Sequence, residues 1–324
     1  MVLDATGRIP VVCAGRVLLH ARVKRFPLCR RVGVACAALF AVFASVLVGC
    51  VTISTDGRTL HGDAQGTVAV VSAPCKATGL PGLNSNGESR TLDTTRLRVL
   101  TWNVHKTEDN GWHEDFARLA ANHDLLALQE AVVNDRLRGA LAQEGYDWRL
   151  TSAFQFLAVE AGVLTAARVP AAGACSLRAT EPVTRIPKSA LTTTYRLSGS
   201  SEKLMVANLH GINFTLGTAA FRNQIEAVAV QLAAHAGPAI LAGDFNTWSS
   251  ERLAVLDEVA GRLGLVAVAL SDDHRTRFLG QPVDGMYYRG LQVVTAAAFP
   301  VTSSDHNPVS VTFRATSSQL ASSH

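Results

Sequence analysis

Six short apolar runs in this 324-residue chain each lead into a cluster of Asn, Asp, Glu or His residues. Strands buried on both faces read as unbroken apolar runs, so polar clusters where such runs begin or end predict side chains gathered along one rim of a sheet. That rim would be an active site. The six stretches are LRVLTWNVHK (97–106), DLLALQE (124–130), KLMVANLH (203–210), PAILAGDFN (238–246), PVDGMYY (282–288) and TSSDHNPVSVTF (302–313).

Helices are predicted between several of these strands, because apolar residues recur there at helical spacing. The helical segments are 112–121, 218–236 and 249–261, and a further strand is expected at 191–197. Strands therefore alternate with helices or follow one another in pairs. This order indicates an α/β protein built in layers, helix on sheet on sheet on helix.

The first 50 residues have a different character and predict an export signal. A basic region (24–31) precedes an apolar run (32–46), and Leu-Val-Gly-Cys follows at 47–50. This order resembles a bacterial lipobox, in which Cys50 would carry the lipid. Since the apolar run is about long enough to cross a bilayer, an uncleaved signal-anchor in the inner membrane is the alternative. Either reading places the rest of the chain in the bacterial cell envelope, and Val51 after Cys50 favours the outer membrane for a lipoprotein.

The predicted domain boundaries follow from these shifts in composition. Residues 1–50 form the export signal, and residues 51–94 form a linker or tether, or an edge strand with a loose linker, with 67–71 as the strand-like run. Residues 95–316 form the catalytic domain. The small, polar residues 317–324 form a tail that we expect to be disordered.

Net charge argues against general binding to nucleic acid. The whole chain has a formal net charge of +4, but residues 1–50 hold seven basic residues and one acidic residue. The remainder has 23 basic and 25 acidic residues, a net charge of −2. Sequence-independent duplex binding usually rests on clustered Lys and Arg, so this balance disfavours a general DNase without excluding a local basic patch.

The six clusters resemble, in order and content, those of the endonuclease/exonuclease/phosphatase superfamily. GDFN is preceded by LQE and NLH and followed by VDG and SSDHNP, and the resemblance covers about residues 95–314. It implies a DNase I-like four-layer α/β/β/α sandwich of two mixed sheets and hydrolysis of phosphate esters with Mg²⁺, for which Mn²⁺ could substitute. The segments IPKSAL, NFTLG, GPAILAGDFNTWS and YYRGLQV are similar to a bacterial branch that supplies this chemistry but no substrate.

Glu130 is the first candidate metal ligand. It follows the apolar residues 125–128, so its carboxylate would lie beside a low-dielectric surface. Keeping the carboxylate ionised there costs free energy unless a cation lies close to it. Mg²⁺ prefers oxygen ligands of this kind. The resemblance makes Glu130 the principal metal ligand, with Asn103 and Asp305 close by. The alternatives are a strand-end salt bridge for Glu130 and a strand-terminating turn for Asn103.

His306 is the candidate general base. An imidazole can take a proton from water near neutral pH when a carboxylate fixes its tautomer. Asp284 is the candidate orienting residue, since the family pairs the VDG and SDH motifs. The alternative for His306 is a hydrogen-bonded structural histidine.

Five further residues are assigned around the phosphoryl group. Asp244 would align the attacking water or assist the leaving group, and Asn246 would hold a phosphoryl oxygen. His210 would stabilise charge on the phosphoryl group or protonate the leaving oxygen, and Asn208 beside it would also contact the substrate phosphate. For Asn208 and His210 the alternative is a buried, hydrogen-bonded pair. Lys106 could reach an anionic substrate or lie in solvent.

Cysteine usage fits export. Cys50 would carry lipid and three of the six cysteines precede it, which leaves Cys75 and Cys175. A remaining pair in an oxidising compartment is a candidate disulfide, and two ordinary buried thiols are the alternative.

The predicted function is therefore that of a Mg²⁺-dependent phosphoesterase exposed in the cell envelope. Its substrate would be a small molecule, a lipid head group or a nucleic acid, with specificity in the loops around the rim. An exported nuclease is the alternative function. The intact set of polar clusters disfavours a third function, that of a binding module with an enzyme fold but no catalytic activity. No protein partner is inferable, and we expect a monomer.

Overall fold

The computed structural model describes residues 51–54, 58–71, 75 and 90–316. The expected export signal with Cys50 and the expected tail (317–324) lie outside these residues. Among the residues that are described, no helix is both long and apolar enough to span a membrane.

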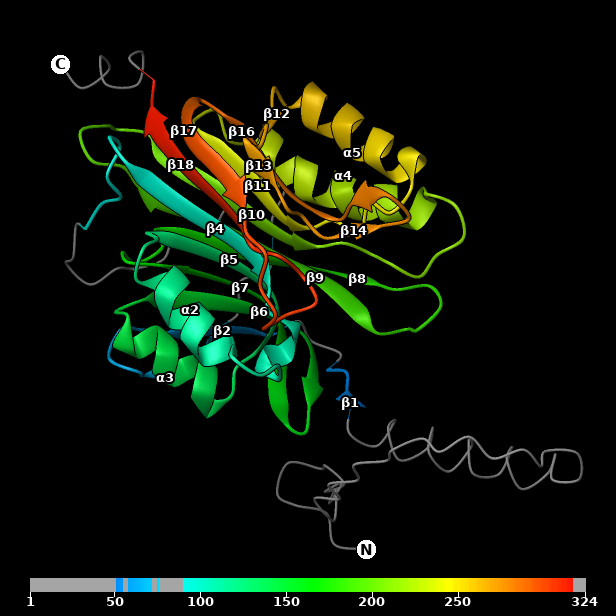
Figure 1. The fold of residues 1–324 in the computed structure, drawn as a ribbon, viewed down its shortest axis with the longest axis horizontal. Coiled ribbons are helices and arrows are strands. Elements are labelled where there is room, and N and C mark those ends of the chain that lie inside the picture. Colours follow the sequence, from blue (N-terminus) through cyan, green and yellow to red (C-terminus); the bar gives the residue numbers. More distant parts are fainter. Residues whose placement is uncertain (1–50, 55–57, 72–74, 76–89, 317–324) are drawn as a thin grey trace, which may run out of the picture.

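Two mixed sheets form the centre of the molecule (Figure 1). The strands of the first sheet are β1 (Val51–Thr52), β2 (Thr59–Gly62), β3 (Val68–Val71), β4 (Leu97–Asn103), β5 (Leu125–Val132), β6 (Asp147–Phe156), β7 (Val159–Ala167), β13 (Asp272–Asp273), β17 (Leu291–Ala298) and β18 (Val309–Ala315). They lie in the order β13-β17-β18-β4-β5-β7-β6-β2-β3, and β1 pairs with β6. The strands of the second sheet are β8 (Gly173–Thr180), β9 (Pro187–Arg196), β10 (Lys203–His210), β11 (Ala239–Asp244), β12 (Val266–Ala267) and β16 (Asp284–Arg289). They lie in the order β12-β16-β11-β10-β9-β8.

Helices cover the outer faces of both sheets. On the first sheet lie α2 (Trp112–Ala120) and α3 (Asp135–Gln143), and on the second lie α4 (Ala219–Ala233) and α5 (Ser250–Arg262) (Figure 1). A short 3-10 helix, η1 (His105–Thr107), follows β4, and a small ribbon of β14 (Arg277–Phe278) and β15 (Gln281–Pro282) precedes β16. The arrangement confirms the predicted four-layer α/β/β/α sandwich.

Alternation along the central strands explains why they are apolar throughout. In β4, Val99 packs between the two sheets, whereas Leu100 packs under α2 and α3. In β5, Leu125 likewise packs between the two sheets and Leu126 packs under the helices. Because successive side chains point to opposite faces, a strand with a covering layer on each side needs an apolar residue at every position.

One edge of the sandwich collects the polar ends of the strands, and we call it the rim. β4 and β5 are parallel, as are β10 and β11, so their carboxyl ends meet there. β16 is antiparallel to β11 and β18 is antiparallel to β4, so these two strands begin at the same edge. The rim therefore receives residues from all six polar clusters.

The region expected to be a linker contributes strands to the first sheet. β2 pairs with β6 from Thr59↔Thr151 to Gly62↔Trp148, and β3 pairs with β2. The pairing depends on Gly62, because a Cβ at that position would lie 2.1 Å from the indole ring of Trp148. β3 (Val68–Val71) coincides with the strand-like run expected at 67–71. β2 was not predicted, because its partner β6 is distant in the sequence and leaves no local signal.

Helix α3 was not predicted either. It is nine residues long and contains Gly139, which lowers helix propensity. Its first turn is held by Asn134, whose side chain accepts a hydrogen bond from the Leu137 amide at 2.9 Å. Leu137 and Leu141 are fully buried against the first sheet.

A disulfide joins Cys75 to Cys175 across a sequence separation of 100 residues. Cys175 lies in β8 of the second sheet, whereas Cys75 follows β3 of the first. Nearby, the Thr59 hydroxyl donates a hydrogen bond to the Ser176 hydroxyl at 3.0 Å. The disulfide and this hydrogen bond connect the outer ends of the two sheets.

Candidate active site

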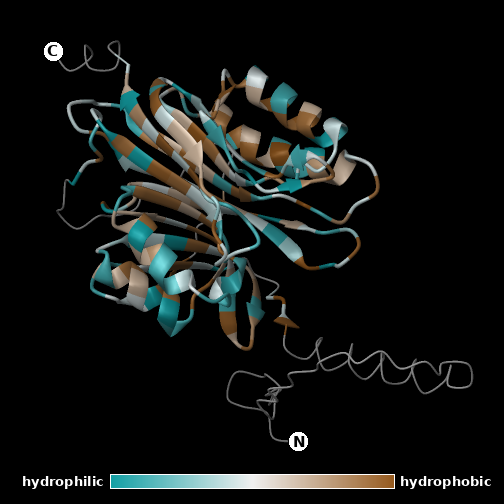
Figure 2. Ribbon diagram, viewed as in Figure 1, coloured by the Kyte–Doolittle hydropathy of each residue, from teal (hydrophilic) through white to brown (hydrophobic). Residues whose placement is uncertain are grey.

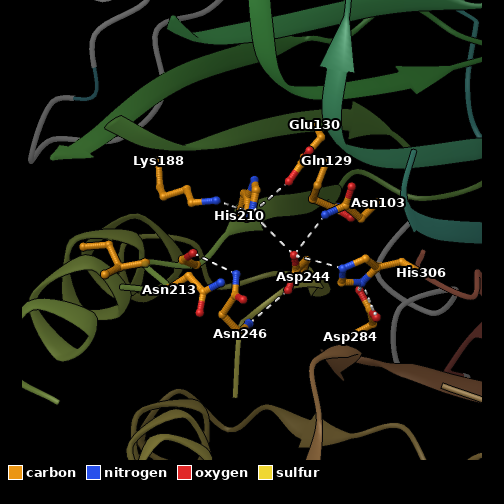
Figure 3. Close-up of polar contacts among 12 residues, drawn as sticks. Asn103, Gln129, Glu130, Lys188, His210, Asn213, Asp244, Asn246, Asp284 and His306 are labelled. Atoms are coloured by element: carbon orange, nitrogen blue, oxygen red, sulfur yellow. Dashed lines mark hydrogen bonds and ion pairs between the residues drawn. The ribbon is translucent and has the colours of Figure 1, made fainter. Parts of the chain in front are cut away.

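His306 and Asp284 form a pair at the rim (Figure 3). Nδ1 of His306 lies 2.8 Å and 3.0 Å from the two carboxylate oxygens of Asp284. Burial opposes protonation of the imidazole, but the negative charges of Asp284, Asp244 and Asp305 outweigh it and raise the pKa of His306 to about 10. Burial raises the pKa of Asp284 to about 6. At pH 7 the two groups are therefore an ion pair.

Asp244 lies at the centre of the site, where it is 2% exposed. Its Oδ2 accepts a hydrogen bond from Asn103 Nδ2 at 3.0 Å and lies 3.4 Å from His210 Nε2 and 3.9 Å from His306 Nε2. Its Oδ1 accepts a hydrogen bond from the backbone amide of Asn246 at 3.0 Å. One carboxylate at the end of β11 thus joins residues from β4, from β10, from the segment after β11 and from the segment before β18 (Figure 3).

Glu130 carries its charge beside two lysines. Lys106 Nζ lies 2.7 Å from Glu130 Oε2, and His210 Nε2 lies 4.0 Å from Oε1. Burial alone would raise the pKa of Glu130, but the charges of His210, Lys106 and Lys188 lower it to about 2. Since His210 is itself neutral at pH 7, the lysines hold the carboxylate ionised there.

Lys188 and His210 form a second pair. Lys188 Nζ lies 2.7 Å from His210 Nε2, so the ammonium donates and the neutral imidazole accepts. Burial, together with the charge of Lys188, lowers the pKa of His210 to about 4. The backbone carbonyl of His210 accepts a hydrogen bond from Gln224 Nε2 at 2.9 Å, which holds the end of β10 against α4.

Three residues of the site have a left-handed backbone. Their φ values are 59° for Lys106, 50° for Glu130 and 53° for Asn246. For Glu130 the cause is a bulge in β5, where the register with β7 shifts between Leu128 and Ala131. Such conformations cost on the order of 1–3 kcal/mol each and persist only where surrounding structure imposes them. The bulge keeps the Glu130 carboxylate at the rim.

Asn208 is placed differently from the prediction that it contacts substrate phosphate. Its side chain is fully buried between the sheets, where Nδ2 donates to the carbonyls of Leu128 and Leu164 at 3.2 Å and 2.9 Å. Its Oδ1 accepts a hydrogen bond from Gln129 Nε2 at 2.8 Å. The amide is committed to joining the two sheets, so Asn208 supports the site and does not face substrate.

Asp305 is exposed and borders a depression of about 660 Å³ beside the site. Asn246 and His306 line the same depression, together with Trp248 and Phe278. A smaller depression of about 290 Å³ is lined by Lys106, Glu130, Lys188 and His210, with Phe214 at its edge. The charged centre therefore opens on two neighbouring hollows.

A sequence profile of the Endonuclease/Exonuclease/phosphatase family matches residues 100–306, which span this whole arrangement. The chain belongs to the endonuclease/exonuclease/phosphatase family. It is accordingly an enzyme, a hydrolase that acts on phosphate ester bonds, as the sequence predicted.

Individual proteins are similar to this chain in sequence or in structure. A UPF0294 protein of Vibrio parahaemolyticus is 39% identical over 236 residues, which cover 72% of this chain and 81% of the relative. The catalytic domain of human nocturnin, solved with bound sulfate, superposes with a TM-score of 0.55 at 19% identity, covering 70% of this chain and 97% of the domain. The mannosyl-6-phosphatase Bt3783 of Bacteroides thetaiotaomicron gives a TM-score of 0.53 at 17% identity, covering 67% and 99%. The two solved structures share the fold.

Two groups of residues in this family site could hold a divalent cation. Asp244, Asp284 and His306 bring one ligand atom each within 4.8 Å of one another. However, both oxygens of Asp284 already lie within 3.0 Å of His306 Nδ1, so a cation there would have to break the pair. Glu130 is the more suitable metal ligand. Its carboxylate already pairs with one cation, the Lys106 ammonium, which a metal ion could replace.

Asn103 completes the second group only after rearrangement. Its Oδ1 now accepts a hydrogen bond from the backbone amide of His105 at 3.1 Å. Glu130, Asn103 and the exposed Asp305 all offer oxygen, the donor that Mg²⁺ and Mn²⁺ take from proteins. The donor set fits the divalent metals on which enzymes of this family generally depend.

Lys188 was missed by the sequence analysis. It lies in IPKSAL, a segment that was noted only as part of the resemblance. A single lysine at the start of a strand has no local signature, and its role depends on β9 lying beside β10. The sequence did identify the groups that Lys188 acts on, His210 and Glu130.

Proposed function

We propose that this hydrolase is a Mg²⁺-dependent phosphoesterase of the cell envelope that acts on a small or lipid-linked phosphate ester. The observation that carries the proposal is the orientation of His306. With Nδ1 held by Asp284, its Nε2 is directed toward Asp244, in the same rim as the ionised Glu130.

His306 would move the proton of the reaction. Because Nδ1 is committed to Asp284, Nε2 is the atom that can exchange a proton with water or substrate. Three carboxylates stabilise the imidazolium. Once His306 has lost that proton, Nε2 can take another from an attacking water, and Asp284 keeps the tautomer fixed.

Glu130, Asn103 and Asp305 would hold the divalent cation. When bound, such a cation neutralises charge on phosphoryl oxygens and lowers the pKa of water. Lys106, which now pairs with Glu130, would be free to turn its ammonium toward the substrate phosphate.

Lys188 would bind a phosphoryl oxygen. One of its three N–H groups donates to His210, which leaves two for a ligand. The pair thus changes the role expected for His210: as a neutral acceptor, it positions the donor and does not itself supply the positive charge. Asn246 donates one N–H of its amide to the Gly211 carbonyl at 3.0 Å and retains the second for a phosphoryl oxygen.

A substrate panel tests this proposal. The full chain would be assayed with Mg²⁺ against bis(p-nitrophenyl) phosphate, p-nitrophenyl phosphate, inositol phosphates, phospholipid vesicles and plasmid DNA. We expect hydrolysis of the activated esters by the parent and loss of at least about 100-fold in His306→Ala. Preference for plasmid DNA over every other substrate would support the exported nuclease instead. No hydrolysis of any ester would contradict the proposal.

We further propose that the protein is anchored as a lipoprotein through Cys50. The support is the order of the basic, apolar and Leu-Val-Gly-Cys segments before residue 51. Mass spectrometry of membrane-extracted protein should show diacylated Cys50 as the first residue. Any other first residue would contradict cleavage at Gly49.

A further inference from the structure

Exposed apolar side chains gather at the rim. Of the described residues, eleven large apolar side chains are exposed, and seven of them lie in turns or segments at this edge. Single exposed apolar residues are ordinary on a protein surface, but a set concentrated on one edge marks an interaction surface. Beside β1 lies Ile53, and the other six are Leu157, Val183, Phe214, Leu216, Phe278 and Leu279.

The topology places these residues on one side. Leu157 lies in the β6–β7 turn, and Val183 in the β8–β9 loop. Because β6 runs parallel to β5 across the intervening β7, and β8 runs parallel to β10 across β9, both turns share the edge that carries Glu130. Figure 2 shows apolar colour on the β6–β7 turn and on β1, which lies at the same side.

The apolar residues surround the chemical centre. Phe214, Leu216, Phe278 and Leu279 border the depression that also contains His306 and Asp305. Leu216 is 97% exposed and Leu279 is 74% exposed, so neither packs within the fold. A soluble substrate would require no such border, since the polar groups that act on phosphate lie inside it.

The chain enters the fold at the same edge. Val51 pairs with Phe156 and Thr52 with Gln155, which holds β1 beside the β6–β7 turn. In the sequence, the apolar run and Cys50 come immediately before Val51. The other end of the described chain is remote, because β18 begins at the rim and ends at the opposite edge (Figure 1).

We infer that the rim docks on the lipid bilayer that holds the N-terminus, with Leu216, Phe278 and Leu279 inserted at the level of the head groups. The inference rests on the membrane anchoring proposed above. An anchor directly before Val51 brings this edge to the bilayer surface, and apolar side chains with basic residues among them suit that interface. Arg185, exposed in the same loop as Val183, supplies such a charge. Phosphate esters carried by membrane lipids would then reach the site from the plane of the bilayer.

Tryptophan reporters test this orientation. The full chain would be reconstituted into phosphatidylethanolamine/phosphatidylglycerol vesicles with or without brominated acyl chains, which quench nearby indoles. Leu216→Trp and Leu279→Trp should each lose at least half of the added emission in brominated vesicles. Val230→Trp and Val266→Trp are the matched controls, because these residues are 50% and 59% exposed. Val230 lies near the C-terminal end of α4, and Val266 pairs with Tyr288 near the end of β16 that is far from the rim. Their added emission should not change.

The outcomes separate this inference from the proposals on which it depends. Co-flotation with vesicles but no quenching at Leu216→Trp and Leu279→Trp would overturn docking of the rim, whether or not the enzyme is active. Equal quenching at all four positions would also overturn it. Dimerisation in solution without quenching would assign the surface to a second copy of the chain. Failure to float would overturn the anchoring and the docking together.

Discussion

Asp244 shows how much of this site depends on charge at single residues. Four groups converge on its buried carboxylate: Asn103 Nδ2, the amide of Asn246, and the imidazoles of His210 and His306. The two imidazoles nonetheless have different charge states at pH 7. His306 is charged because carboxylates surround it, whereas His210 is neutral because burial and Lys188 oppose its protonation.

Lys188→Met should raise the pKa of His210 from about 4 toward its ordinary value of 6.5, because the variant removes a neighbouring positive charge. A charge-assisted hydrogen bond to the substrate would also be lost, so kcat/KM should fall about 10- to 100-fold. Titration of the imidazole by NMR and steady-state kinetics would measure the two effects. Lys203→Met, an exposed lysine at the other end of β10, should change neither. An unchanged His210 titration would show that Lys188 does not contact this imidazole.

Asp284→Asn should move the pH profile of turnover to lower pH. If neutral His306 is the base, kcat rises as pH rises through its pKa, which Asp284, Asp244 and Asp305 hold above the ordinary 6.5. Loss of the negative charge at Asp284 lowers that pKa, so the acid limb shifts down. The plateau should also fall about 100-fold because the tautomer is no longer fixed.

The control for this profile is Asp135→Asn, whose side chain is 94% exposed on α3. Measurements of kcat at saturating substrate and Mg²⁺ from pH 5 to 10 would record the rising limb of both curves. A parent profile that falls, instead of rising, with increasing pH would show that His306 acts as the imidazolium, and the role of general base would be wrong.

The chemistry-bearing residues could be read from the sequence because each polar cluster adjoins a strand. Glu130 and His306 were found in this way, and the structure brings them to one rim. The left-handed backbone of Glu130 could not be found, since it arises from a bulge against β7. The role expected for Asn208 was wrong. A strand pattern shows which side chains share a face, but it does not show that Gln129 of the other sheet donates a hydrogen bond to the Asn208 side chain.

At the scale of elements, β2 and β3 extend the folded unit toward the N-terminus. Gly62→Ala should destabilise the protein by about 1–3 kcal/mol, because the new methyl group would meet the Trp148 ring. Gly139→Ala is the matched control: a Cβ there meets nothing within 4 Å, and the helix should gain up to about 1 kcal/mol. Denaturant unfolding would measure both. Parental stability in Gly62→Ala would mean that the β2–β6 pairing does not contribute to the fold.

Elements with strong internal periodicity were predictable, and those held by distant contacts were not. Helices α2, α4 and α5 lie within one to three residues of the expected bounds, because their apolar faces repeat over two or more turns. Helix α3 has an interior glycine and depends on its cap and on Leu137 and Leu141. β2 is four residues long and is specified by its partners in β6.

For the molecule as a whole, the sandwich places one polar rim between two sheets that are joined at several points. The Cys75–Cys175 disulfide and the Thr59–Ser176 hydrogen bond connect the sheets at one end. Asn208 connects them beneath the site through the carbonyls of Leu128 and Leu164. A rigid attachment of this kind keeps Glu130 of the first sheet and Asp284 of the second in a fixed arrangement at the rim.

The most direct test of this account is the metal dependence of phosphodiester hydrolysis in matched proteins. Turnover of bis(p-nitrophenyl) phosphate would be measured for the parent, Glu130→Gln and Glu258→Gln over a range of Mg²⁺ concentrations and in excess EDTA. Glu258 is an exposed carboxylate of α5 paired with Arg222, so its variant should match the parent. We expect no turnover in EDTA and a loss of at least about 100-fold in Glu130→Gln with the fold retained. Full turnover in EDTA, or a Glu130→Gln variant as active as Glu258→Gln, would contradict the account.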